Sequence, residues 1–257
     1  MDIKINKNQQ FKLPLAKKYI EEDINIITEV DDYAFKSLVD GTITKVTKQD
    51  LAGLTSIRNH AFYYSPITSI ELPDSITEIG KDAFSYSKIK SVKFPDSMTS
   101  LTEGFFRCYD LESVDLGKGI THLGAWCLSE NTSLTSIDIS NITRADKGPF
   151  QGAGLTHITI PGTLNTVSQS FCNRCKSLAS VRMENGVAKI NSYAFGDCTA
   201  LMEIVCLSTN PPVLDATSLN NVLADCVIKV PVASVDAYKT ATNWSARADY
   251  IIAYEGD

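Results

Sequence analysis

A 22-residue repeat constrains the fold of this chain more than any other feature of its 257 residues. The segment ITSIELPDSITEIGKDAFSYSK (Ile67–Lys88) aligns without gaps with the next one, IKSVKFPDSMTSLTEGFFRCYD (Ile89–Asp110). Apolar residues fall at the same positions in both copies, as Phe84 and Phe106 do. A period of this length is typical of a solenoid, in which one short coil stacks on the next.

Related segments extend the period along most of the chain. Half a coil occupies residues 27–35, and full coils follow at Ile43–Pro66, Ile67–Lys88, Ile89–Asp110, Leu111–Ser133, Leu134–Gly154, Leu155–Ser177 and Leu178–Ala200. A column of large apolar residues tests this register: Phe35, Phe62, Phe84, Phe106, Leu128, Phe150, Cys172 and Phe195. We expect these side chains to stack in one core, with Phe171 beside Cys172 as its substitute.

Each coil combines a short strand, a turn and a return segment. Ile67, Ile70 and Leu72 alternate so that all three face inward from one strand. Pro73 ends the strand, and the Asp-Ser pair that follows favours a turn. Because one coil cannot cover its own apolar face, the coils must stack to form a core.

The two ends of the chain fall outside the repeat array, which spans residues 24–206. Residues 1–23 fit no coil, and we expect a cap over the first coil, with an anchor to another protein as the alternative. Residues 207–257 predict a C-terminal cap with a strand at 226–230 and a short amphipathic helix within 233–242. Trp244, Tyr250 and Ile251 are predicted to seal the last coil.

The charge and hydropathy of the chain exclude some classes of partner. The formal net charge is −6 and the longest basic run is the pair Lys17–Lys18, which argues against nucleic acid or an anionic membrane as partner. No apolar stretch approaches the roughly 18–20 residues that span a bilayer. Residues 1–23 lack the apolar core of a signal peptide. We therefore expect a cytosolic or virion-borne protein, or a chain from which an export signal has been removed.

The cysteine count is seven, so at least one thiol is free or pairs between chains. Cys172 and Cys175 form a CxxC motif, but no second pair of Cys or His residues completes a zinc site. Cys175 and Cys198 occupy the same slot in adjacent coils, so a disulfide between them is the alternative to reduced thiols. We expect reduced thiols near the core, and neither a metal nor a cofactor.

No residue pattern indicates catalysis. His60, His122 and His157 fall in different slots of the repeat, without a local carboxylate or thiol partner. The motifs G-x-S-x-G and H-E-x-x-H are absent, and so is the P-loop spacing of a nucleotide site. We interpret the histidines as surface residues and expect that the protein is not an enzyme.

The outward positions of the first strand are one candidate binding surface. In the pattern L-x-x-I-x-L, the third and fifth residues point away from the core and stack into two columns along the sheet. The candidates in these columns are Ser69, Glu71, Ser91, Lys93, Ser113, Asp115, Asp138, His157 and Arg182. The alternative is a solvated face of serines and alternating charges.

The turns after the apolar column form a second candidate surface. Tyr64, Tyr86 and Tyr109 follow the column in three successive coils, and Arg107 and Arg174 lie in the same turns. Tyrosine beside arginine is common contact chemistry in protein interfaces. The alternative is that these rings pack at the corners of the coils.

The repeat unit L-x-x-I-x-L-P-x-S-[IV]-T-x-I-G-x-x-A-F resembles the BspA-type leucine-rich repeat, also called the Treponema pallidum-type repeat. The resemblance covers about residues 24–206. It continues in the tail, where VPVASVDAYK and Trp244 are similar to the closing segment of such proteins from gut Bacteroidota. The resemblance implies a mainly β, right-handed leucine-rich-repeat coil of about eight repeats of 22–23 residues. Members are mostly cell-surface or secreted adhesins, and they share no catalytic residues.

These observations predict a non-enzymatic binding or adhesion module that presents a solenoid surface to a protein or glycan partner. The alternative is a structural component of a larger assembly, for example a phage virion or fibre, anchored through residues 1–23. The resemblance implies a location at the cell surface or outside the cell, whereas the lack of an export signal leaves the virion and the cytoplasm as alternatives.

Overall fold

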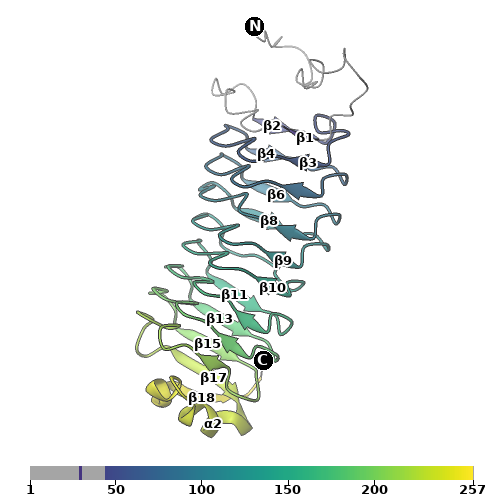
Figure 1. The fold of residues 1–257 in the computed structure, drawn as a ribbon. Coiled ribbons are helices and arrows are strands. Elements are labelled where there is room, and N and C mark those ends of the chain that lie inside the picture. The colour runs from purple at the N-terminus through teal and green to yellow at the C-terminus, as the bar shows by residue number, and fades with distance from the viewer. Residues whose placement is uncertain (1–28, 31–43, 257) are drawn as a thin grey trace, which may run out of the picture.

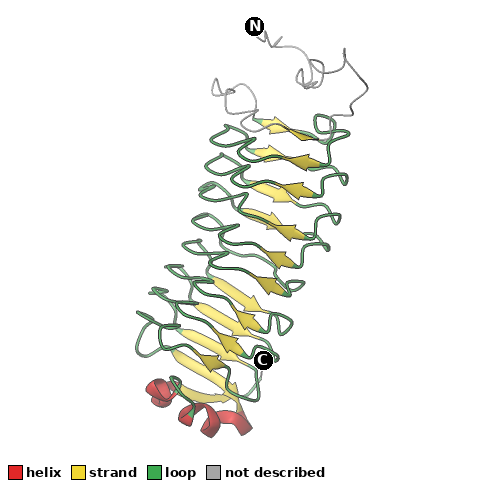
Figure 2. Cartoon of the chain, viewed as in Figure 1, coloured by secondary structure: helices red, strands yellow, loops and turns green. Residues whose placement is uncertain are grey.

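The computed structural model describes residues 29–30 and 44–256 of the chain (Figure 1). The chain coils into an elongated, mainly β solenoid of about nine turns (Figure 2). All strand pairings among the described residues are parallel, as expected when each coil lies on the one before it. Residues 1–23, for which a cap or an anchor was predicted, lie outside the described residues.

The strands lie on two faces of the solenoid. The first face comprises β2 (Lys45–Val46), β4 (Ser69–Ile70), β6 (Ser91–Lys93), β8 (Ser113–Asp115), β11 (His157–Ile160), β13 (Ser180–Met183), β15 (Glu203–Cys206), β17 (Val227–Pro231) and β18 (Ile251–Tyr254). The second face comprises β1 (Glu29–Val30), β3 (Ser56–Ile57), β5 (Glu78–Ile79), β7 (Ser100–Leu101), β9 (His122–Leu123), β10 (Arg144–Ala145), β12 (Thr166–Val167), β14 (Lys189–Ile190) and β16 (Val213–Leu214).

The inward positions of each coil form one continuous hydrophobic core. Along β11, His157 and Thr159 are exposed whereas Ile158 and Ile160 are buried, which is the predicted alternation. The rings of Phe62 and Phe84 stack with their centroids 4.9 Å apart.

The next ring in this stack is Phe105, not Phe106, so the predicted apolar column was wrong at this position. Phe105 is fully buried and stacks on Phe84 at 4.7 Å, whereas Phe106 is half-buried. The Gly104 N–H donates to the Thr102 carbonyl in a three-residue turn, which shortens the path to the core by one residue. The side chain of Phe106 therefore lies outside the core.

A buried polar ladder runs beside the phenylalanine stack. The Cys108 thiol donates to the Phe84 carbonyl (3.0 Å) and the Cys198 thiol to the Cys172 carbonyl (3.1 Å). Asn131 makes two such bonds: its Nδ2 donates to the Phe105 carbonyl and its Oδ1 accepts from the Cys108 N–H. These side chains satisfy backbone groups of the neighbouring coils, which would otherwise be buried without a partner.

All seven cysteines are free and buried, which confirms their predicted position in or near the core. Burial raises the pKa of the Cys108 thiol to about 12 and that of Cys226 to about 11. Because the thiolate is the reactive form, these thiols are chemically inert in the folded protein.

The ladder continues past Cys206, where the repeat array fades in the sequence. β15 pairs with β17 and β17 with β18 on the first face, while β14 pairs with β16 on the second. The sequence obscures this last part of the coil because Pro211-Pro212 and a long turn break the spacing of apolar residues.

Three short helical segments close the C-terminal end: η1 (Val232–Ser234), α2 (Val235–Thr240) and η2 (Ser245–Tyr250). α2 confirms the predicted helix. Trp244 and Ile251 are buried as expected, whereas Tyr250 is 39% exposed, so its predicted sealing role was wrong. Tyr238 takes that role, because it is fully buried and its hydroxyl donates to the Ser208 carbonyl (2.8 Å).

One coil interrupts the first sheet face. On either side of it, backbone hydrogen bonds join equivalent residues of successive coils, and each amide after the first in a run donates to the preceding carbonyl. The two runs are Thr44, Thr68, Lys90 and Glu112, and then Thr135, Thr156, Ala179, Met202 and Val227. Within the described chain, no backbone hydrogen bond joins β8 to residues 135–140, and residues 136–140 form no strand. We call this interruption the ladder gap.

A shortened turn accounts for the ladder gap. Two residues lie between the inward-facing Ile139 and Ile142, whereas three lie between Leu116 and Ile120 in the preceding coil. The strand predicted at residues 136–139 is therefore displaced from the register of its neighbours. On the second face the same coils stay joined, because β9 pairs with β10.

Candidate binding surfaces

The outward columns of the first face exist as predicted, but in two blocks. Register places Ser69, Ser91 and Ser113 side by side, and Lys93 beside Asp115. Beyond the ladder gap, His157 lies beside Ser180 and Thr159 beside Arg182. Asp138 lies between the blocks and is joined to neither by a described ladder bond.

The charges on this face pair mostly with one another. Lys45 contacts Glu71 at 2.8 Å and Lys93 contacts Asp115 at 3.0 Å. The Gly117 N–H and then the Lys93 ammonium hold the pKa of Asp115 below its usual range. These pairs balance the charge on this face, and because they are exposed they contribute little to the stability of the fold.

Arg182 is also held by the protein itself, near the C-terminal end of the face. Its guanidinium donates to Glu184 (2.7 Å) and to the hydroxyl of Tyr254 on β18 (3.0 Å). Of the nine candidates on this face, Glu71, Lys93, Asp115 and Arg182 thus already have charged or aromatic partners. The structure shows no reason to favour this face as a whole over a solvated surface.

The predicted tyrosines behave differently from one another. Tyr64 and Tyr86 stack with their ring centroids 4.6 Å apart, and Tyr63 meets both rings edge-on. Tyr109 is exposed and makes no described ring contact. The structure therefore brings together two of the three predicted tyrosines.

Arginine extends this stack into the next coil. Arg107 donates from Nη1 to the Tyr86 hydroxyl (3.1 Å), and its guanidinium lies 4.7 Å from the centre of the Phe106 ring. We call Tyr63, Tyr64, Tyr86, Phe106 and Arg107 the tyrosine cluster. Cation–π and aromatic contacts of this kind hold long side chains in fixed positions at a surface.

An open groove of about 430 Å³ adjoins the tyrosine cluster. It is lined by Lys81, Asp82, Glu103, Phe106, Arg107, Trp126, Glu130, Gln151 and Arg174. We call it the rim groove. Its charges balance, because Lys81 pairs with Glu103 (3.2 Å) and Arg174 approaches Glu130 (3.9 Å).

The backbone at the rim groove is strained. Trp126 has φ of +50°, and Arg107, Glu130 and Arg174 also have φ between +56° and +62°. A bulky residue in this left-handed conformation costs about 1–2 kcal/mol. The same conformation recurs at this turn in coils outside the groove, as Tyr193 (φ +54°) and Asp197 (φ +56°) show, so it belongs to the repeat turn rather than to the groove alone.

Two glycines make room for the side chains that line the rim groove. A Cβ on Gly148 would lie 2.9 Å from the indole nitrogen of Trp126, and one on Gly152 would lie 2.7 Å from Oε1 of Glu130. Trp126 and Glu130 therefore lie across the turn of the next coil. The ammonium of Lys147 lies 5.4 Å from the Trp126 ring.

Sequence reasoning missed Trp126 and placed Phe106 in the core. A signal for Trp126 was present: the same slot carries small or polar residues or histidine in most other coils (His60, Asp82, Gly148 and Ser170) and another large aromatic residue at Tyr193. A polar turn slot occupied by a large aromatic residue has no packing reason within its own coil.

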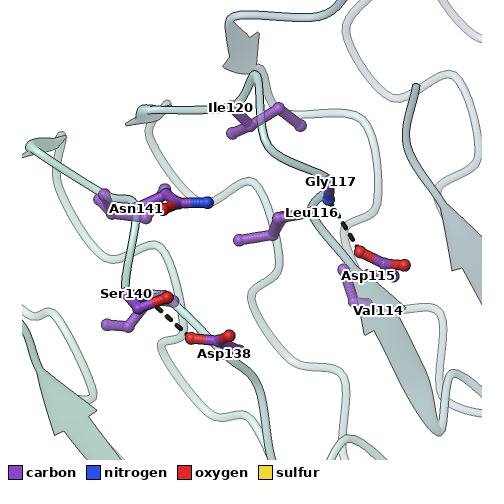
Figure 3. A pocket seen from close by; sticks show the side chains of 10 residues that line it. Val114, Asp115, Leu116, Gly117, Ile120, Asp138, Ser140 and Asn141 are labelled. Atoms are coloured by element: carbon purple, nitrogen blue, oxygen red, sulfur yellow. Dashed lines mark hydrogen bonds between the residues drawn. The ribbon is translucent and has the colours of Figure 1, made fainter. Parts of the chain in front are cut away.

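A smaller pocket of about 250 Å³ lies at the ladder gap (Figure 3). Its apolar lining comes from Val114, Leu116, Ile120, Ile139 and Ile142, and its polar lining from Asp115, Gly117, Asp138, Ser140 and Asn141. Figure 3 shows Leu116 pointing into the space between the two coils. We call it the gap pocket.

Two of the three histidines have carboxylate partners in the next coil, beyond the local sequence for which no partner was found. His122 Nε2 lies 2.9 Å from Asp146, and His60 Nε2 lies 3.8 Å from Asp82. Each partner lies one coil later in the sequence, where a local search does not find it. His157 is exposed, as expected.

The described residues offer little else for chemistry. No group of three or more His, Cys, Asp or Glu side chains among them is placed to hold a metal ion. None of the helices in the described part of the chain is long and apolar enough to cross a membrane.

Several solved structures are similar to this chain. A leucine-rich repeat protein of Treponema pallidum is 17% identical, with a TM-score of 0.53 over 62% of this chain and 78% of that one. A Bacteroides ovatus leucine-rich repeat protein is 15% identical (TM-score 0.43; 80% of this chain, 74% of that one). A leucine rich cell surface protein of Faecalibacterium prausnitzii is 17% identical (TM-score 0.38; 83% and 79%). No curated protein matches this chain.

The family profile described as "BspA type Leucine rich repeat region" matches in six copies, over residues 27–153, 55–179 and 165–215. Together these ranges cover most of the chain, including all coils predicted from the period. They also reach past Cys206, as the strand ladder does. The chain therefore belongs to the BspA-type leucine-rich repeat family.

Proposed function

We propose that this chain is a non-enzymatic binding module and that the rim groove holds part of its protein or glycan partner. Membership of the BspA-type family supports an interaction or adhesion module. The proposed location is the cell surface, supported by membership of the BspA-type family.

The observation that carries the proposal is the composition and rigidity of the rim groove. Trp, Tyr and Arg are the residues that dominate binding energy in protein interfaces, and Trp126, Tyr86, Arg107 and Arg174 lie in or beside this groove. Tyr86 and Arg107 are already fixed by stacking and hydrogen bonding. A surface ordered before binding loses less conformational entropy when its partner arrives.

The first sheet face lacks these properties. Its outward columns carry serines, threonines and charged residues, and several of the charges are paired, as Lys45 and Glu71 are. Solvent-exposed ion pairs of this kind add little to binding affinity. We therefore place the partner at the turns rather than on the sheet.

A binding screen with matched variants tests this proposal. Immobilised full-length protein is exposed to extracellular matrix proteins, a glycan array and bacterial surface extracts, and the same screen is run with Trp126→Gly and Tyr193→Gly. Trp126 (φ +50°) and Tyr193 (φ +54°) occupy the same slot in different coils, and the coil after Trp126 carries Gly148 there. Glycine adopts this left-handed backbone without strain, so both substitutions should preserve the turn. Tyr193 is 39% exposed and lies outside the groove, so it is the control.

We expect specific partners for the wild type and the Tyr193→Gly variant, and at least a tenfold loss of affinity for Trp126→Gly, as for a hot-spot tryptophan. Equal affinity of both variants would remove the rim groove from the proposal. Hydrolytic turnover of a bound partner by the pure protein would overturn the non-enzymatic assignment.

A further inference from the structure

The gap pocket is separate from the rim groove and offers a different chemistry. It lies on the first face between two coils whose backbones are not joined there, whereas the rim groove lies at the turns. At about 250 Å³ it is smaller than sites for drug-sized ligands, which start at about 300 Å³. Its size suits a single side chain.

The floor of the gap pocket is apolar and its mouth is acidic. Leu116 and Ile139 line the pocket from adjacent coils, and both are buried. Asp115 and Asp138 lie at the mouth, one from each coil, and both are exposed (Figure 3). The combination fits a side chain with an apolar stem and a cationic end, which is how lysine and arginine bury their stems.

The two carboxylates at the mouth are not equally satisfied. In each, Oδ1 accepts a bond from the backbone two residues later, Gly117 N–H for Asp115 and Ser140 N–H for Asp138. Asp115 Oδ2 is paired with Lys93 of the preceding coil. The equivalent residue in the coil before Asp138 is Asp115, which carries the same charge, and no described basic side chain pairs with Asp138. An added cation would therefore meet an uncompensated charge.

The backbone at the ladder gap is also unpaired. β8 has a neighbour only on the β6 side, and residues 136–140 form no strand with either neighbour. A free strand edge presents N–H and C=O groups at the spacing that an extended peptide matches. Binding to such an edge supplies affinity from the main chain, while a pocket beside it selects a side chain.

We propose that the gap pocket binds an extended segment of a protein partner and receives one lysine or arginine side chain from it. The stem of that side chain packs on Leu116 and Ile139, and its cationic end meets Asp138. The main chain of the segment hydrogen-bonds to the free edge of β8. This site is independent of the rim groove, so either proposal can fail without the other.

Methyl NMR with short peptides tests the proposal on the full chain. The apolar floor consists of valine, leucine and isoleucine, so labelled methyl groups of Val114, Leu116, Ile120, Ile139 and Ile142 report directly on the pocket. The probes are blocked heptapeptides of sequence Thr-Val-Thr-Xaa-Thr-Val-Thr, in which Xaa is Lys, Arg, norleucine, Ala or Glu. Norleucine keeps the apolar stem and removes the charge.

We expect the Lys and Arg peptides to shift these methyl signals at low millimolar concentration, norleucine more weakly, and Ala and Glu not at all. Asp138→Asn is expected to weaken the Lys peptide roughly two- to fivefold, the range of an exposed ion pair, and to leave norleucine unchanged. Glu71→Gln, a paired carboxylate on the same face, is the control and should change neither.

A second variant keeps the proposal falsifiable if Asp138 has other roles. Asn141 lies at the mouth of the pocket (Figure 3) and is exposed, so Asn141→Trp should cover the opening and abolish the shifts from every peptide. The proposal is overturned if no peptide shifts the five residues, if Glu binds as well as Lys, or if Asp138→Asn leaves the Lys peptide unaffected.

Discussion

Two adjacent phenylalanines provide a direct test of the coil register. Phe105→Ala removes a fully buried ring that stacks on Phe84 at 4.7 Å and meets Phe94 edge-on at 5.4 Å. Phe106→Ala removes a half-buried ring from the tyrosine cluster, where it contacts Arg107 and the edge of Tyr86. The two substitutions are chemically identical and one residue apart, so their difference measures position alone.

The expected costs follow from burial. A buried phenylalanine truncated to alanine leaves a cavity, and the loss is about 3–5 kcal/mol in the free energy of unfolding. Phe106 forfeits a cation–π contact of about 0.5–1 kcal/mol and an aromatic contact of about 0.5–1.5 kcal/mol. We therefore expect the Phe105 variant to be less stable than the Phe106 variant by about 0.5–4 kcal/mol.

Urea titration followed by circular dichroism measures this difference, with the slope checked so that a change in midpoint reports stability. Wild-type protein and Phe94→Leu, a milder change in the same core, are the controls. If Phe106→Ala is as destabilising as Phe105→Ala, or more so, the register described for this coil is incorrect and the sequence alignment was right.

Three further predictions concern the polar ladder, the thiols and pH. Asn131→Ala leaves a buried N–H and a buried C=O unpaired and should cost about 2–4 kcal/mol, measured by urea titration, with faster amide exchange at Cys108 as its local signature; unchanged exchange there would contradict it. All seven cysteines should resist a thiol reagent in the native state and react in urea, because all are buried and burial raises the pKa of thiols such as that of Cys108; rapid labelling of native protein would refute this. The folded pKa of Asp115 is lowered, so its contribution to stability is present above the unfolded pKa near 4 and is lost as pH falls through the folded value. Asp115→Asn should therefore reduce the difference in the free energy of unfolding between pH 7 and pH 3. An unaltered difference would contradict the assignment of the lowered pKa to the Gly117 N–H and Lys93.

The period of the chain was sufficient to predict the solenoid because apolar spacing reports which residues face inward. It was insufficient where a turn differs in length by one residue. Gly104 allows a tighter turn that brings Phe105 rather than Phe106 into the core. The short turn between Ile139 and Ile142 opens the ladder gap. In each case one residue of turn length moves a side chain to another surface.

The binding surfaces were harder to predict than the fold because they depend on contacts between coils. Tyr64 and Tyr86 were identified from their turn positions, but their stacking requires two coils in register. His122 and Asp146 are 24 residues apart and meet only because the coils lie side by side. Trp126 was overlooked because its role depends on the glycine at position 148 in the next coil.

The most direct test of the functional account compares the two solenoid surfaces against one partner. Once the screen identifies a partner, its affinity is measured for a rim pair, Trp126→Gly with Arg107→Ala, and for a face pair, Glu71→Gln with Arg182→Ala. The account predicts at least a tenfold loss for the rim pair and less than about a twofold change for the face pair. A loss confined to the face pair would contradict the assignment of the rim groove as the binding surface.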